Sequence, residues 1–308
     1  MNTHTNTVTG SQLESQGNAL AVVPVTRPFY WSVRRELWEN RSTYLAPLAA
    51  AAVFLFGFVI HTMVLRHRMH GIWTLSPEQQ YDTFAAPYGI AAGLIMGTAF
   101  IVGVFYSLDA LYGERRDRSI FFWKSLPVSD LTVVLSKVTI PIVILPLLSF
   151  AITIATQLMM LVLSSIVLMG SGLDIGTLWT HSSFLHVSLM LLYHIVTVHG
   201  LWYAPFYGWL LLISVLVRRA PFIWAFLPPF VIGVVEQMTF RTNHFFTMMV
   251  SRLMGPEVAT PMGSSMMDQM AALTPARFFA LPGLWIGLAI AAALLAAAVR
   301  LRRSRGPI

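Results

Sequence analysis

Apolar residues occur along most of the chain in long runs, separated by short stretches that carry most of the charges. A helix needs about 20 mainly apolar residues to cross the hydrocarbon core of a bilayer. Six runs reach that length, and they predict spans at residues 44–65, 85–108, 138–169, 184–217, 222–240 and 281–299. The pattern therefore predicts an all-α, polytopic membrane protein with six transmembrane helices.

The third and fourth runs each exceed 30 residues, which is longer than one perpendicular span requires. Proline and glycine supply positions at which such helices bend. Pro141 and Pro146 lie in the third run, and Gly200 and Pro205 lie in the fourth. We expect both helices to tilt or to kink at these residues.

Composition supports the membrane assignment and excludes two other classes. The chain of 308 residues is 56% hydrophobic and 11% charged, whereas soluble domains have about 25% charged residues. A disordered chain would need low hydrophobicity and high charge density. The chain has no cysteine, which excludes disulfides and thiolate metal sites.

The formal net charge of +7 would, taken alone, also fit a nucleic-acid-binding protein. The positions of the cations indicate a different cause. Fifteen of the twenty Lys and Arg residues fall in one set of alternating loops and tails, as the positive-inside rule describes for cytoplasmic loops. We therefore predict a bacterial-type inner-membrane protein with both termini in the cytoplasm and no nucleic-acid partner.

The segments outside the spans have distinct compositions. They predict a flexible cytoplasmic tail at 1–28, an interfacial helix at 29–42, a cytoplasmic loop at 109–137, an outer loop at 241–280 and a basic tail at 300–308. The interfacial helix is amphipathic, as expected for a helix lying on the lipid bilayer. Its apolar face is expected to hold Tyr30, Trp31, Val33, Leu37 and Trp38, with Arg35, Glu36 and Glu39 opposite.

The cytoplasmic loop carries the most informative sequence. A dense charge cluster, Glu114 to Arg118, is followed directly by Ile120, Phe121, Phe122 and Trp123. Pro127 ends any helix formed there, and Ser129 or Asp130 can cap the next one. The apolar run needs a packing partner. That partner could be the protein's own helix ends, the lipid interface or another polypeptide, and the residues alone do not decide between them.

This loop resembles the first cytoplasmic loop of the ABC-2 type transporter permeases. In that family a charge cluster precedes a Gly-Thr-Leu-like triplet, a short apolar helix, a Pro-Val-Ser step and a Gly-Lys pair. Here Ser119-Ile120 stands at Thr-Leu, and Pro127-Val128-Ser129 matches the Pro-Val-Ser step. Arg118 and Ser136 replace the two glycines. The predicted interfacial helix, six spans and cytoplasmic termini also resemble the family's layout.

The resemblance implies a permease subunit of an ATP-driven exporter. Such a subunit pairs with a second permease copy, here expected as a homodimer, and with two copies of a separate ATP-binding subunit. The loop residues implied to contact that subunit are Glu114, Arg115, Arg116, Asp117, Arg118, Phe121, Phe122, Trp123, Lys124, Pro127 and Lys137. The helix at about 118–126 would be the coupling helix.

ATP and Mg are expected in the partner subunit and no cofactor in this chain, because the sequence has no Gly-x-x-x-x-Gly-Lys-Ser/Thr loop. We therefore expect the chain not to be an enzyme. Two other functions remain open from the residues alone. One is an intramembrane lipid-modifying enzyme with a site among His186, His194 and Glu236, and the other is a non-transporting signalling assembly.

Ionisable residues inside spans are costly and are therefore candidates for a substrate path. These candidates are His186, His194, His199 and Glu236. At about 100° per residue, the spacings of eight and five residues place the three histidines on different helix faces. We therefore expect no metal site there. For Glu236, a local contact with Arg241 is an alternative to a substrate path.

Methionines are concentrated in the outer loop, which holds seven of the sixteen. Thioethers bind Cu(I), and Met266, Met267 and Met270 have a spacing that resembles a ligand set. Methionine is also a flexible apolar filler of short helices that dip into a bilayer. The sequence favours this packing role over copper handling.

Overall fold

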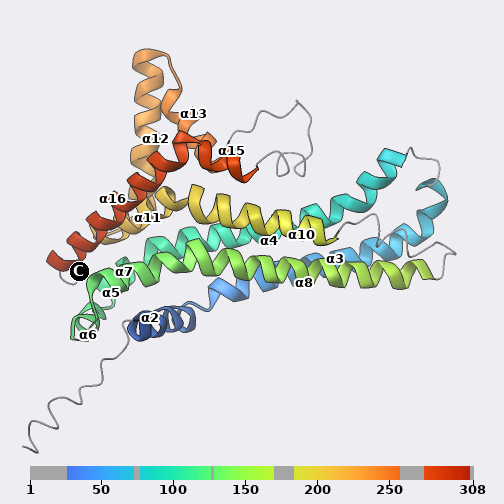
Figure 1. Ribbon diagram of the computed structural model, residues 1–308, viewed down its shortest axis with the longest axis horizontal. Coiled ribbons are helices and arrows are strands. Elements are labelled where there is room, and N and C mark those ends of the chain that lie inside the picture. The colour runs from blue at the N-terminus through green and yellow to red at the C-terminus, as the bar shows by residue number, and fades with distance from the viewer. Residues whose placement is uncertain (1–25, 73–76, 126–127, 170–183, 257–273, 306–308) are drawn as a thin grey trace, which may run out of the picture.

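Figure 1 shows the computed structural model of the chain, in which residues 26–72, 77–125, 128–169, 184–256 and 274–305 are described. Every regular element within these ranges is a helix. In chain order they are α2 (Thr26–Glu39), α3 (Ser42–Ile72), α4 (Pro77–Asp109), α5 (Tyr112–Arg116), α6 (Ile120–Ser125), α7 (Asp130–Thr139), η1 (Ile140–Ile144), α8 (Leu145–Met169), α10 (Phe184–His194), η2 (Ile195–Trp202), α11 (Ala204–Leu216), α12 (Pro221–Phe240), α13 (His244–Met254), α15 (Pro275–Ala280) and α16 (Pro282–Ser304).

The helices have the length and composition of a multi-pass membrane protein. Among the described residues, five stretches are long and apolar enough to cross a membrane: Ser42–Met63, Ala86–Arg116, Asp130–Ile166, Pro221–Phe240 and Pro282–Ser304. A sixth span results if the bent pair Ser188–Trp202 and Ala204–Leu216 is counted as one. The prediction of an all-α chain with several apolar spans is confirmed at this level.

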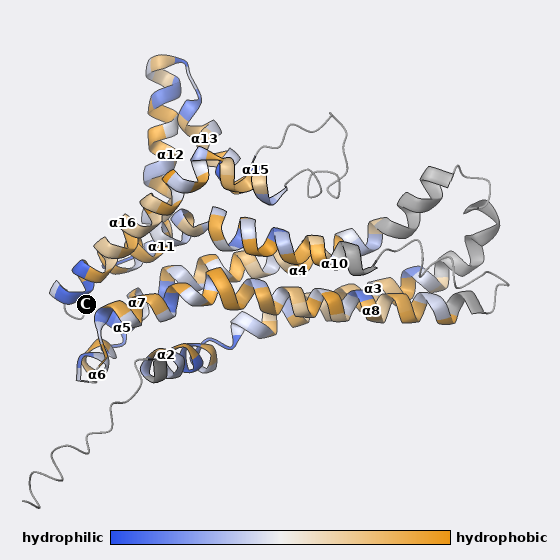
Figure 2. Ribbon diagram, viewed as in Figure 1, coloured by the Kyte–Doolittle hydropathy of each residue, from blue (hydrophilic) through white to orange (hydrophobic). Residues whose placement is uncertain are grey.

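Three long helices, α3, α4 and α8, run along one another, and each contacts the other two (Figure 1). α10 and η2 lie along α8, and α11 packs on both α4 and α16. The approach of α11 to α16 is close, since a Cβ added at Gly208 would lie 3.5 Å from the carbonyl oxygen of Ala291. Figure 2 shows that apolar residues occur along most of the length of these helices, as expected for membrane spans.

Two π-helices interrupt the third and fourth apolar runs. η1 contains Pro141, and η2 contains Gly200. The chain bends by 45° between Trp202 and Ala204, between the glycine and the proline from which the sequence predicts a kink. π-Helical turns are rare and often mark functional sites. The two π-helices contact each other, so both irregular segments meet at one place in the bundle.

The orientation of α2 differs from the expectation. Val33 and Leu37 pack onto the bundle, but Tyr30, Trp31 and Trp38 are exposed. Glu36, assigned by the sequence to the polar side, is only 2% exposed. The prediction of a water-facing Glu36 was wrong, because it took every polar residue of the helix to face water. In the structure Glu36 has a charged partner inside the protein. The exposed aromatic side chains suit a membrane interface.

Candidate functional site

Five elements from distant parts of the chain meet at one end of the bundle. They are α2, α5, α6, α7 and the C-terminal part of α16, and we call this region the basic end (Figure 1). Most residues that the sequence singles out in the loop 109–137 lie here. We take this region as the candidate site because charged side chains and exposed aromatic side chains lie together in it.

The start of α5 is held by a side chain from α11. Ser214 Oγ accepts the backbone N–H groups of Leu111 at 3.0 Å and Tyr112 at 2.8 Å. Arg115 on α5 in turn donates to the carbonyl oxygens of Val215 at 2.6 Å and Val217 at 3.2 Å. These carbonyls lie at the C-terminal end of α11. The last carbonyl groups of a helix have no hydrogen-bond partner within the helix. α5 and α11 therefore satisfy each other's free backbone groups.

A buried network of opposite charges joins α2, α5, α7 and α16. Lys137 Nζ lies 2.7 Å from Glu36 Oε1 and 3.1 Å from Glu114 Oε1. Arg302 Nη2 lies 3.1 Å from Glu114 Oε2, and its Nη1 pairs with Asp130. Tyr106 Oη on α4 donates to the second oxygen of Glu36 at 2.8 Å. We call these side chains the ion network.

The ion network is inside the protein, with Lys137, Glu36, Glu114 and Arg302 between 2% and 6% exposed. Removing one partner from a buried ion pair typically costs about 3–5 kcal/mol, because the other charge stays buried without compensation. Each central residue has two partners on different helices. The network therefore fixes the relative positions of α2, α5, α7 and α16.

The exposed surface of the basic end lies on α6. Trp123 is buried at 5% exposure, whereas the neighbouring Phe121 and Phe122 are 60% and 51% exposed. The Arg35 guanidinium of α2 lies 4.9 Å from the ring centre of Phe122 and 4.7 Å from that of Trp123. α6 is thus anchored on one side and presents two phenylalanines on the other.

Lys124 anchors α6 at its other end. Its Nζ donates to the carbonyl oxygens of Arg303 at 3.5 Å and Arg305 at 3.2 Å. These carbonyls lie at the end of α16, where a cation interacts favourably with the helix dipole. Arg305 itself donates to the carbonyl oxygen of Leu216 at 2.6 Å. The ends of α11 and α16 are therefore connected to α6.

The predicted contact residues are divided by the structure into two groups. Glu114, Arg115, Trp123 and Lys137 are buried and have partners within the chain. The exposed group consists of Arg116, Asp117, Arg118, Phe121, Phe122 and Lys124. Pro127 lies outside the described residues. The sequence groups these residues in one loop but does not separate the residues of its internal ion pairs from those of its accessible surface.

Sequence reasoning did not assign Glu36, Tyr106, Asp130 or Arg302 to this site. A signal was present, since Lys137 precedes a long apolar run without an acid nearby in sequence other than Asp130. A lysine at such a place needs an opposite charge from elsewhere in the chain. The identity of that partner depends on the packing of α2 and α16.

Arg118, between α5 and α6, has an unusual backbone conformation. Its φ angle is 59°, in the left-handed region that costs a non-glycine residue about 1–2 kcal/mol. This is the position at which the resembled loop motif has glycine. A glycine there would remove the steric conflict of the Cβ atom.

The histidine pair of the fourth apolar run is closer than predicted. The ring centres of His194 and His199 are 6.1 Å apart. The prediction of different faces was wrong for these two, because it used the α-helical period and residues 195–202 form a π-helix. In a π-helix the backbone bonds join residues five apart. The side chain of His186 lies outside the part of the chain whose side chains are described.

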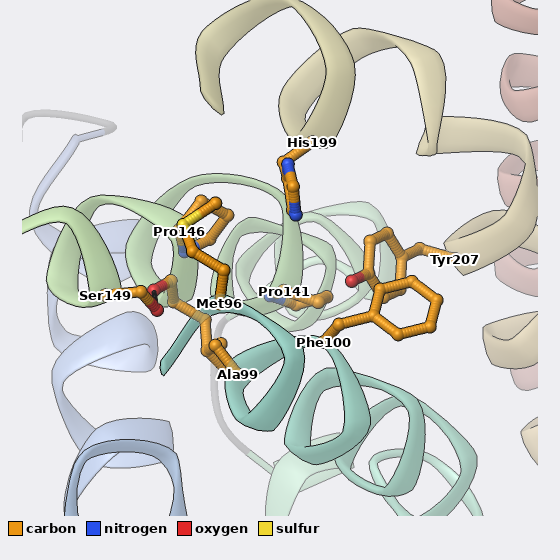
Figure 3. A pocket seen from close by; sticks show the side chains of 9 residues that line it. Met96, Ala99, Phe100, Pro141, Pro146, Ser149, His199 and Tyr207 are labelled. Carbon is orange, nitrogen blue, oxygen red and sulfur yellow. Dashed lines mark hydrogen bonds between the residues drawn. The ribbon is translucent and has the colours of Figure 1, made fainter. Parts of the chain in front are cut away.

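His199 also borders a small, partly open cavity of about 10 Å³, room for about one water molecule. Figure 3 shows its imidazole pointing from η2 toward Pro141 and Tyr207. Ser149 and Phe100 line the same cavity. The cavity lies between the helices of one chain, where the two π-helices meet.

Glu236, near the C-terminal end of α12, binds the start of α13. Its Oε1 accepts from Thr242 Oγ1 and from the backbone N–H of His244, each at 2.9 Å, and its Oε2 accepts from the N–H of Phe245 at 2.8 Å. The carboxylate thus binds the first turn of α13, where a negative charge is favourable. Its partners are Thr242, His244 and Phe245, whereas the sequence offers Arg241 as an alternative to a substrate path.

α13 is fastened to η2 and α16 at its C-terminal end. Trp202 Nε1 donates to the carbonyl oxygen of Arg252 at 3.0 Å, and Tyr203 Oη donates to that of Leu253 at 2.8 Å. The Arg252 guanidinium lies 4.0 Å from the Trp202 ring centre and donates to the carbonyl oxygen of Gly283 at 2.9 Å. Burial lowers the pKa of Arg252.

Comparison with known proteins supplies no assignment: no protein-family model, curated protein or solved structure matches the chain. Within the described residues, no group of three or more His, Cys, Asp and Glu side chains is placed to hold a metal ion. The Met266, Met267 and Met270 set lies outside those residues. The function therefore has to be argued from the site itself.

Proposed function

We propose that this chain is the transmembrane subunit of an ATP-driven exporter of the ABC-2 permease type, with its basic end in the cytoplasm of a bacterial-type inner membrane. It forms a translocation pathway with a second copy of itself, and separate ATP-binding subunits dock beneath α6. The observation that carries the proposal is α6 itself, a short helix with exposed Phe121 and Phe122 on a rigid, charged base.

The exposed pair favours a protein partner at α6. Two neighbouring exposed phenylalanines have little reason to face water, and aromatic side chains are the usual anchors of protein interfaces. The charged Arg116, Asp117 and Arg118 beside them are exposed as well. This arrangement of an aromatic centre with a charged rim is typical of a transient docking surface.

The ion network supports a mechanical role for this surface. A force on α6 reaches α2 through Arg35 and α16 through Lys124. From there, Glu36 and Arg302 connect to α7 and α5 through buried ion pairs. Elements connected in this way move as one body, which is how a partner's closure is transmitted to membrane helices.

The conformation of Arg118 gives a physical reason for the family's loop motif. The motif has glycine at this position, and the backbone here is left-handed. Glycine adopts that conformation without strain. The turn between α5 and α6 in this chain therefore has the geometry that the motif's own residue would favour.

The proposal is tested by photo-crosslinking in the native membrane. A photoreactive amino acid at Phe121 is expected to crosslink a protein that binds and hydrolyses ATP. The matched control is the same amino acid at Phe230 on α12, which is 59% exposed compared with 60% for Phe121. Position 230 lies in an apolar span and is expected to crosslink lipid instead.

Two further measurements make the test decisive. Phe121→Ala should lower ATP-dependent transport activity of the purified complex while the chain's own thermal stability stays within about 0.5 kcal/mol, as for most surface changes. The docking proposal is wrong if position 121 crosslinks only lipid, or only a protein that does not hydrolyse ATP.

A further inference from the structure

The π-helix η2 brings two imidazoles together inside an apolar stretch. In an α-helix, residues five apart point about 140° away from each other at about 100° per residue. In η2 the i to i+5 backbone pattern places His194 and His199 one turn apart, with ring centres 6.1 Å apart and ring planes inclined by 64°. The pair therefore exists because of the π-helix.

Both histidines have an unused nitrogen. The Nδ1 atoms of His194 and His199 are buried and have no hydrogen-bond partner among the described residues. A buried polar atom without a partner costs about 1–3 kcal/mol. Two neighbouring rings therefore each offer a free nitrogen to a ligand.

Within the described part of the chain, no acidic residue lies on η1, α8, α10, α11 or α16, which pack against η2. The titratable neighbours are Tyr203, whose ring centre is 5.1 Å from that of His199, and Tyr207 at the cavity. Arg252, which lies on α13, is stacked on Trp202. Among the described residues, the two imidazoles are therefore the groups available to hold a bound ligand.

The distance between the rings fits one metal ion between two nitrogens. Imidazole nitrogens bind metals at about 2 Å, and adding about 1 Å from each nitrogen to its ring centre gives about 6 Å for a nearly linear arrangement. The small cavity beside His199 has room for about one water molecule. A histidine that binds a metal through one ring nitrogen usually forms a hydrogen bond through its second ring nitrogen, and a water molecule can be the partner of that bond.

We propose that His194 and His199 form a two-coordinate binding site for one soft monovalent metal ion of the Cu(I) class. Zinc prefers four ligands in a tetrahedral arrangement, and the described residues offer no cluster of three or more His, Cys, Asp and Glu groups. Calcium and magnesium require oxygen ligands. A monovalent soft ion is the class that needs the fewest ligands and the least compensating negative charge.

The outer segment supplies an approach to this site. α13 carries Met248 and Met254, which are 61% and 84% exposed. The C-terminal end of α13 is hydrogen-bonded to Trp202 and Tyr203, at the bend that follows η2. Gly255, directly after α13, lies next to Val198, which precedes His199 in the sequence. Thioethers are soft ligands that exchange Cu(I). The chain that follows Met254 thus contacts the helix that carries the His194–His199 pair, and the thioethers of α13 have the same metal preference.

The site is tested with Ag(I), a redox-inert probe for Cu(I), on the full chain in lipid nanodiscs. We expect one high-affinity Ag(I) per chain, bound more tightly than any Ag(I) held by methionines, with X-ray absorption showing nitrogen ligands. His194→Gln and His199→Gln should each lower Ag(I) affinity at least tenfold. The matched controls are His61→Gln and His244→Gln, which change histidines on α3 and α13 and should leave the affinity unchanged.

Circular dichroism of each variant distinguishes loss of the site from loss of the fold. The proposal is overturned if the His194→Gln/His199→Gln double variant binds Ag(I) as the unchanged chain does, or if the ligands are sulfur only. It is also overturned if Zn(II) binds this pair more tightly than Ag(I). The experiment uses the chain without any ATP-binding partner, so its outcome is independent of the proposed exporter function.

Discussion

Lys137 on α7 donates a hydrogen bond of 2.7 Å to Glu36 on α2, a residue 101 positions earlier in the chain. Both side chains are almost fully buried. This pair is the centre of the ion network, because Lys137 also contacts Glu114 at 3.1 Å. The interfacial helix is thereby held to the bundle by charge as well as by apolar packing.

Replacing Lys137 is expected to destabilise the chain strongly. Lys137→Met leaves Glu36 and Glu114 buried near each other without a cation, and the expected loss is about 3–5 kcal/mol. The measurement is thermal unfolding of the purified chain in detergent. The control is Lys124→Met, which changes the only other lysine, an exposed residue that bonds to two backbone carbonyls. Equal losses in both variants would contradict a special role for the network.

Arg118→Gly is expected to stabilise the chain. It removes the left-handed strain of about 1–2 kcal/mol, and the greater freedom of glycine in the unfolded chain offsets part of the gain. We expect a net increase of about 0.5–1 kcal/mol in the free energy of unfolding. Arg116→Gly, in α5, is the matched control and should destabilise by about 1 kcal/mol. A loss of stability in Arg118→Gly would show that the Arg118 side chain matters more than its backbone.

Gly287→Ala is expected to loosen α13. A Cβ at this position would lie 2.7 Å from Arg252 Cζ, so the guanidinium would have to leave its place on Trp202. Overpacking of this kind costs about 1–3 kcal/mol. The matched control is Gly97→Ala, where an added Cβ has no heavy atom within 4 Å.

The cause of the Gly287 effect is tested by a double-mutant cycle with Arg252→Ala. If the collision with Arg252 is responsible, Gly287→Ala should cost little in the Arg252→Ala background. Thermal unfolding gives the four free energies. An unchanged cost would mean that α16 packs against something other than Arg252 at this position.

Glu236→Gln is expected to free the start of α13. The carboxylate accepts two backbone N–H groups and the Thr242 hydroxyl, and a neutral amide is a weaker acceptor at a helix N-terminus. Trypsin should then cleave after Arg241 several-fold faster. Glu39→Gln, which changes an acid in an exposed pair with Arg35, should leave cleavage after Arg241 unchanged.

The broad architecture follows from the sequence because it depends on one strong physical requirement. Apolar runs of sufficient length predict spans, and the five helices and one bent pair occupy these runs. The kink residues are also readable, since the bend after Trp202 lies between Gly200 and Pro205. These features depend on local composition, which a single sequence contains.

The site was less predictable because its key contacts depend on packing between distant segments. Glu36 reads as a polar surface residue until α7 brings Lys137 against it. His194 and His199 read as unrelated until the helix changes from the α to the π pattern. Hydrophobic periodicity does not show where a helix changes from the α pattern to the π pattern, which shifts its register by one residue. That shift decides whether two histidines five residues apart lie on the same face.

The ion network also sets an order of events during biosynthesis. Arg302, the partner of Glu114, is added by the ribosome 188 positions later. Before α16 is made, Lys137 can already pair with Glu36 and Glu114, but the pairs of Arg302 with Glu114 and Asp130 cannot form. The basic end therefore acquires its full set of ion pairs only once the last described helix is in place.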